Sequence, residues 1–168
     1  MSYVAALASF LLFDLIWFSA VAGRQDWLLV SAALVLLQWL LCGWRKQLSW
    51  RLSGSLFAAG IVLELSVSQL GFIEFNGGWL PSWLLLLWLG FAAMAPVAFA
   101  WLAHKPAIAA LLGALFAPIS YIIGVKLGAA SSTNLVLLYL AYAVAYALYM
   151  VLLSAALKRF ATSTMLSR

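Results

Sequence analysis

The chain has 168 residues, of which 68% are hydrophobic, 15% aromatic and 8% charged. A soluble domain carries about 25% charged residues and 45–50% apolar ones, so this composition excludes an ordinary soluble enzyme, a disordered chain and a nucleic-acid-binding module. Nine Lys and Arg against four Asp and Glu give a net charge of +5. Because charged residues are so few, this excess indicates how the chain is oriented in a membrane and does not indicate a phosphate-binding surface. The composition predicts an integral membrane protein with little mass outside the bilayer.

Apolar segments follow one another along the whole chain. A helix that crosses a hydrocarbon core of about 30 Å needs about 20 apolar residues. We expect membrane spans at residues 3–22, 27–43, 51–70, 81–102, 106–126 and 134–157. The prediction is therefore an all-α fold, in which residues 1–168 form one domain, a bundle of six transmembrane helices.

The first apolar segment ends in Ala20-Val21-Ala22, which looks like a signal-peptidase site. However, no basic residue precedes this segment, and Asp14 and Trp17 lie in its middle. Both features are atypical of a signal peptide. We therefore expect the segment to remain in the protein as the first transmembrane helix.

The longest stretch without helical pattern separates the third and fourth spans. Asn76-Gly77-Gly78 is a turn signal within it, because these residues tolerate positive φ. Pro81 suits the first turn of the following helix, where its missing N–H would have no partner. Pro96 lies inside the fourth span and should kink it, because it removes one helix hydrogen bond.

The basic residues predict the orientation of this bundle. Seven of the nine lie in the loops after spans two and four or at the C-terminal end: Arg45, Lys46, Arg51, Lys105, Lys158, Arg159 and Arg168. Arg24 and Lys126 lie on the opposite side. By the positive-inside rule, both termini should be cytoplasmic.

Motifs that carry chemistry are scarce. Cys42 and His104 are each the single residue of their type, so an intrachain disulfide and a Cys- or His-cluster metal site are excluded. No zinc-protease, nucleophile-elbow or Walker A pattern occurs in the sequence. We therefore expect no catalytic residue, no metal and no cofactor.

Ionisable residues within the spans are the strongest indication of a site. Asp14, Glu64, Tyr121 and Lys126 should all lie in the outer half of the bundle, and ionisable groups in a membrane normally face the bundle or a partner. We expect these four to form one polar cluster, in which an ammonium offsets the cost of a buried carboxylate. The alternative is that Lys126 extends to the headgroups and each acid is hydrogen-bonded locally.

The last span carries Tyr139, Tyr142, Tyr146 and Tyr149, whose spacing of 3, 4 and 3 places them on one stripe of a helix. Buried Tyr hydroxyls usually find a hydrogen-bond partner, so the stripe should face the bundle, either for packing or to line a ligand. The candidate ligand-binding residues are therefore Asp14, Trp17, Glu64, Tyr121, Lys126, Tyr142 and Tyr146.

Several stretches resemble a family of small bacterial inner-membrane proteins classed as a domain of unknown function. They are Gly71-Phe72-Ile73-Glu74-Phe75, Leu80-Pro81-Ser82-Trp83-Leu84, Phe13-Asp14-Leu15-Ile16-Trp17 and Pro118-Ile119-Ser120-Tyr121. Members often carry Gln at the position of Asp14 and Asp at that of Glu64, and they are more polar around Pro96. The resemblance implies the bacterial inner membrane and a lipid-linked role, because genes of this family tend to lie beside those for fatty-acyl-modifying enzymes.

Three functions remain open. The chain could bind or handle a lipid, fatty-acyl or similar amphiphilic molecule, as an accessory to membrane-lipid modification. Alternatively, it could be a small transporter or transporter subunit that uses Asp14 and Glu64 for ion or solute binding. An enzyme with the two acids as acid and base is the third, although nothing in the sequence supplies a nucleophile. The expected partners are membrane lipid and a membrane protein or a second copy of the chain, but no nucleic acid.

Overall fold

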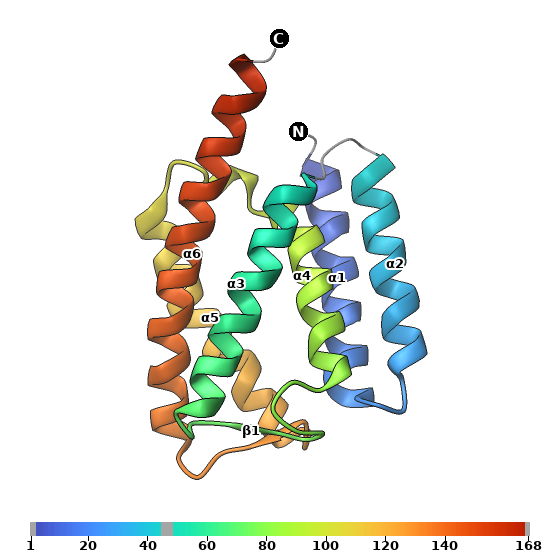
Figure 1. The fold of residues 1–168 in the computed structure, drawn as a ribbon, viewed down its shortest axis with the longest axis vertical. Coiled ribbons are helices and arrows are strands. Elements are labelled where there is room, and N and C mark those ends of the chain that lie inside the picture. The colour runs from blue at the N-terminus through green and yellow to red at the C-terminus, as the bar shows by residue number, and fades with distance from the viewer. Residues whose placement is uncertain (1–2, 45–48, 167–168) are drawn as a thin grey trace.

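The structure is a computed structural model that describes residues 3–44 and 49–166. Within these ranges the chain is all-α apart from one short strand pair (Figure 1). The helices are α1 (Tyr3–Gly23), α2 (Leu28–Trp44), α3 (Trp50–Gln69), α4 (Ser82–Ala98), α5 (Pro106–Lys126) and α6 (Leu135–Leu166), with a short 3₁₀ helix η1 (Ala100–Leu102) after α4.

The membrane character expected from the composition is supported by four helices that are long and apolar enough to cross a bilayer. These are α1, α3, α5 and the segment Leu135–Phe160 of α6. The other two helices, α2 and α4, are apolar but shorter, with 17 residues each. Large apolar side chains face outward along the bundle, for example Leu29 at 86% exposure, as suits a surface in contact with hydrocarbon.

The helices pack as two groups joined by α3. Helix α5 packs along α6, whereas α1 packs against α2 and α4. Helix α3 contacts both α4 and α6 and so connects the groups. The pairing of α5 with α6 depends on Gly113, where a Cβ would lie 2.5 Å from the backbone oxygen of Tyr146. Small residues allow such close approach between membrane helices.

A strand pair ties two connections together at one end of the bundle (Figure 1). Strand β1 (Glu74–Phe75) lies antiparallel to β2 (Ala130–Ser131), with Glu74 opposite Ser131. The turn expected after β1 is confirmed, since Gly77 has φ of +104° and Gly78 of +98°, values that favour glycine. The strand pair itself has no signal in the sequence, because each strand is only two residues long.

Two of the expected helix boundaries are wrong. Residues 81–102 do not form one kinked helix: α4 ends at Ala98, two residues after Pro96, and the chain continues as η1. Pro96 lacks the N–H that would secure the last turn, which explains the early end. In the other direction, α6 continues past residue 157 to Leu166, because Lys158 and Arg159 end the apolar pattern without breaking a helix.

Candidate functional site

Glu64 lies at the centre of a hydrogen-bond network that joins four helices. The side chain comes from α3 and is completely buried, with 0% exposure. Its Oε1 accepts a hydrogen bond from Nε1 of Trp88 on α4, at 3.0 Å, and another from the hydroxyl of Tyr121 on α5. Its Oε2 accepts from the hydroxyl of Tyr142 on α6, at 2.8 Å. One carboxyl group therefore connects α3 to each of α4, α5 and α6.

The aromatic partners of Glu64 are held by close packing. The rings of Tyr121 and Tyr142 stack with their centroids 3.5 Å apart, and the hydroxyls of Tyr121 and Tyr146 share a hydrogen bond of 2.9 Å. The indole of Trp88 lies directly over Gly60, where any Cβ would overlap it. Gly60 is one helical turn before Glu64 on α3, so the missing side chain is what lets the indole reach the carboxyl group.

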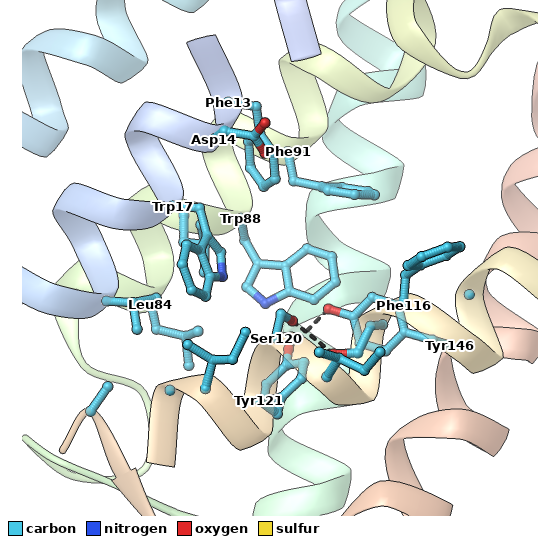
Figure 2. Close-up of a pocket in the computed structure, with 18 of the residues that line it drawn as sticks. Phe13, Asp14, Trp17, Leu84, Trp88, Phe91, Phe116, Ser120, Tyr121 and Tyr146 are labelled. Atoms are coloured by element: carbon cyan, nitrogen blue, oxygen red, sulfur yellow. Dashed lines mark hydrogen bonds between the residues drawn. The ribbon is translucent and has the colours of Figure 1, made fainter. Parts of the chain in front are cut away.

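A pocket of about 630 Å³ lies beside this network, between α1 and α4 on one side and α5 and α6 on the other (Figure 2). Its walls are largely aromatic and include Phe13, Trp17, Trp88, Phe91, Phe116 and Tyr146. Ile73, Phe75, Ala129 and Ala130 from the two strand-bearing connections also line it. Few polar groups reach the pocket, chiefly those of Asp14, Ser120, Tyr121 and Tyr146.

The structure separates the residues expected to form one polar cluster. Glu64 and Tyr121 meet as predicted, but Asp14 is not among the groups that bond to Glu64. Lys126 is exposed at the last position of α5 and forms no ion pair with either acid. The predicted carboxylate–ammonium cluster is therefore wrong, because three neutral N–H and O–H donors occupy the positions that a cation would take.

The other candidate residues lie in the pocket wall or directly behind it. Asp14 and Trp17 line it from α1, and Tyr121 and Tyr146 belong both to the pocket and to the Glu64 network. Tyr142 is fully buried behind the pocket wall and bonds to Glu64. The stripe of tyrosines faces the bundle at Tyr142, Tyr146 and Tyr149, and Tyr149 donates a hydrogen bond to the backbone oxygen of Leu56. Tyr139, at the start of the stripe, is only half-buried.

Sequence reasoning missed Trp88 as a partner of Glu64. Most tryptophans of the chain fall near span ends, where an aromatic belt explains them, whereas Trp88 lies within α4. A Trp N–H inside a membrane span needs an acceptor, and Glu64 is one of the few available. That requirement was the signal that could have linked the two residues.

Helices suited to crossing a membrane, around a buried acid and an aromatic pocket, define an all-α protein of the membrane class. The family described as "Protein of unknown function (DUF2878)" matches residues 6–152, and the chain belongs to this family. Comparison with curated proteins and with solved structures gives no match. This match confirms the family resemblance noted in the sequence, and it covers more of the chain than the stretches that suggested the resemblance.

Proposed function

We propose that the protein binds a hydrophobic or amphiphilic molecule, such as a lipid or a fatty-acyl chain, in the pocket between α1, α4, α5 and α6, and acts as an accessory to membrane-lipid modification. The observation that carries the proposal is the pocket itself, about 630 Å³ and walled by aromatic and aliphatic side chains. Ligand sites typically have volumes of about 300–1,000 Å³ and predominantly apolar walls with a few polar groups.

The position of the pocket supports access from the membrane. Phe10 on α1 and Phe116 on α5 both line it, and they are 39% and 63% exposed at the bundle surface. The pocket thus reaches the side of the bundle between these two helices. If α1 and α5 span a bilayer, that side faces hydrocarbon, so an acyl chain would reach the pocket without crossing water.

We also propose that all six helices cross the membrane, with both ends of the chain on the cytoplasmic side of a bacterial inner membrane. Helices α2 and α4 would each measure about 26 Å at 1.5 Å per residue, close to the bilayer core. The start of α1 and the end of α6 lie at the same end of the bundle (Figure 1). Arg51, Lys105, Lys158 and Arg159 belong to that end, whereas Arg45, Lys46 and Arg168 lie outside the described residues.

A transporter is the second candidate, favoured by the placement of the two acids. Asp14 lines the pocket, and Glu64 lies one hydrogen bond behind its wall, through Tyr121. Intramembrane acids of this kind often mark ion or solute paths. Proton-coupled uptake by the purified protein in liposomes would support a transporter, whereas stable retention of an amphiphile without transport would support the binding protein.

The proposal is tested by identifying the molecules that copurify with the protein. We expect mass spectrometry of protein purified in a mild detergent to find an amphiphile bound in stoichiometric amount. Ala117 on α5 lines the pocket, so Ala117→Phe should fill it and reduce that amount at least tenfold. Ala107→Phe, on an exposed position of the same helix outside the pocket, is the matched control. Equal retention by both variants would contradict the proposal.

A further inference from the structure

The pocket has an unbalanced charge. Among the described residues that line it, Asp14 alone is formally charged at neutral pH, and none is Lys, Arg or His. The second acid, Glu64, lies just behind the wall and is hydrogen-bonded to Tyr121, which lines the pocket. The two acidic groups therefore lie in or next to the pocket wall, and none of the described lining residues carries a positive charge that would balance them.

Asp14 has no partner of its own within the part of the chain that the structure describes. It lies near the middle of α1, is exposed at the pocket, and makes no hydrogen bond or ion pair with the described residues. A carboxylate at such a depth is expensive unless it is paired, and acids in membrane spans normally have a partner. Because no described residue provides a partner, a bound molecule is suited to supply it.

The residues around Asp14 indicate which chemical group the bound molecule would place there. Figure 2 shows Asp14 beside Phe13 and Phe91, with Trp17 further along the same wall. The rings of Phe13 and Phe91 meet edge to face, with centroids 5.7 Å apart. Aromatic faces attract cations, and a set of aromatic rings with a carboxylate is suited to an ammonium group. A phosphate or carboxylate headgroup, in contrast, would meet only like charge.

We propose that the ligand of this pocket is a cationic amphiphile, whose ammonium group pairs with Asp14 while its apolar body fills the aromatic part of the pocket. The inference rests on the proposed function, since it specifies which amphiphile the same pocket selects. It excludes free fatty acids and purely anionic lipids as occupants. The ammonium could belong to a simple long-chain amine or to the headgroup of a zwitterionic lipid.

The test compares amphiphiles that differ only in their polar group. Dodecylamine, dodecanol and dodecanoate are offered to the purified, delipidated protein in a neutral detergent, and native mass spectrometry measures the bound fraction of each. Asp14→Asn removes the charge with little change in size. Asp26→Asn is the matched control, because Asp26 is an acid in the turn after α1 and does not line this pocket.

We expect the unmodified protein and Asp26→Asn to prefer dodecylamine to dodecanoate at least tenfold, and Asp14→Asn to lose this preference while it still binds dodecanol. Equal binding of the three amphiphiles, or a preference that survives Asp14→Asn, would overturn the cation proposal and leave the pocket as a binding site. Binding of none of them, with no effect of Ala117→Phe, would overturn the proposed function as well.

A lysophosphatidylethanolamine added to the same series distinguishes the two sources of the ammonium group. Its headgroup carries an ammonium together with a phosphate. Binding that depends on Asp14 would assign the ammonium to a lipid headgroup. If the lysophosphatidylethanolamine does not bind but dodecylamine does, the ammonium group belongs to an amine without phosphate. We expect this second result, because none of the described residues that line the pocket is basic and could pair with a phosphate.

Discussion

Glu64 is a buried acid that has no basic partner among the residues that the structure describes. Its two oxygens accept hydrogen bonds from one indole N–H and two phenol hydroxyls, each from a different helix. Removing a buried acceptor leaves its donors unpaired, and each unpaired buried donor costs about 1–3 kcal/mol. The side chain therefore links the helices, and we expect its removal to destabilise the bundle.

We predict that Glu64→Ala lowers the free energy of unfolding by about 2–6 kcal/mol, because Trp88 and Tyr142 each lose their acceptor. Glu64→Gln should cost less, since an amide oxygen still accepts one of these hydrogen bonds. Unfolding in detergent, followed by circular dichroism, measures both effects. Glu74→Gln, at an exposed position of β1, is the control and should change stability by less than about 0.5 kcal/mol.

Lys126 gives the opposite prediction. The structure leaves its ammonium exposed at the end of α5, away from the bonds to Glu64. We expect Lys126→Met to change the free energy of unfolding by less than about 0.5 kcal/mol, as for most exposed positions. The same unfolding assay tests this prediction. A decrease of about 3 kcal/mol or more in the free energy of unfolding would indicate that Lys126 does form the buried ion pair expected from the sequence.

At the scale of elements, α3 determines the geometry of the site. It contacts both α4 and α6, and its glycines differ sharply in their surroundings. Gly60 lies under the indole of Trp88, whereas Gly54 has no neighbouring atom within 4 Å of a Cβ position. The two positions thus offer a matched comparison on a single helix.

We predict that Gly60→Ala destabilises the protein by about 1–3 kcal/mol, because the new methyl group displaces Trp88 in a packed core. Gly54→Ala should leave stability unchanged or raise it by up to about 1 kcal/mol, since alanine favours a helix over glycine. Thermal unfolding gives the stabilities, and tryptophan fluorescence reports the displaced indole. Similar stability of the two variants would show that Trp88 has room to move.

At the scale of the whole molecule, the proposed six-span topology makes a direct prediction. The connection at residues 74–78 and the C-terminal end should lie on opposite sides of the membrane, since three helices, α4, α5 and α6, separate them and basic residues gather at the C-terminal end. Topology reporters fused within residues 74–78 and at residue 168 should therefore give opposite compartments. Equal signals from the two fusions would be incompatible with six spans.

The sequence by itself determined the class of protein and most helix positions. A composition with 68% hydrophobic residues cannot be reconciled with a soluble domain, and the polar turns between apolar runs set most helix boundaries, although not the ends of α4 and α6. Helix α5 (Pro106–Lys126) begins and ends at the expected residues. These features are local, since hydropathy and Gly or Pro chemistry act within one segment. The spacing of the tyrosines on α6 likewise predicted which face turns inward.

Only the tertiary structure decided which polar groups meet. Depth along a span shows how far a residue lies from the membrane surface, but it says little about the direction in which the side chain points around the helix axis. Asp14, Glu64 and Lys126 were placed together by depth, yet Asp14 lines the pocket, Glu64 is buried between α3 and its neighbours, and Lys126 is exposed. The network around Glu64 joins residues from four helices, and such long-range contacts depend on how the helices pack, which no single segment encodes.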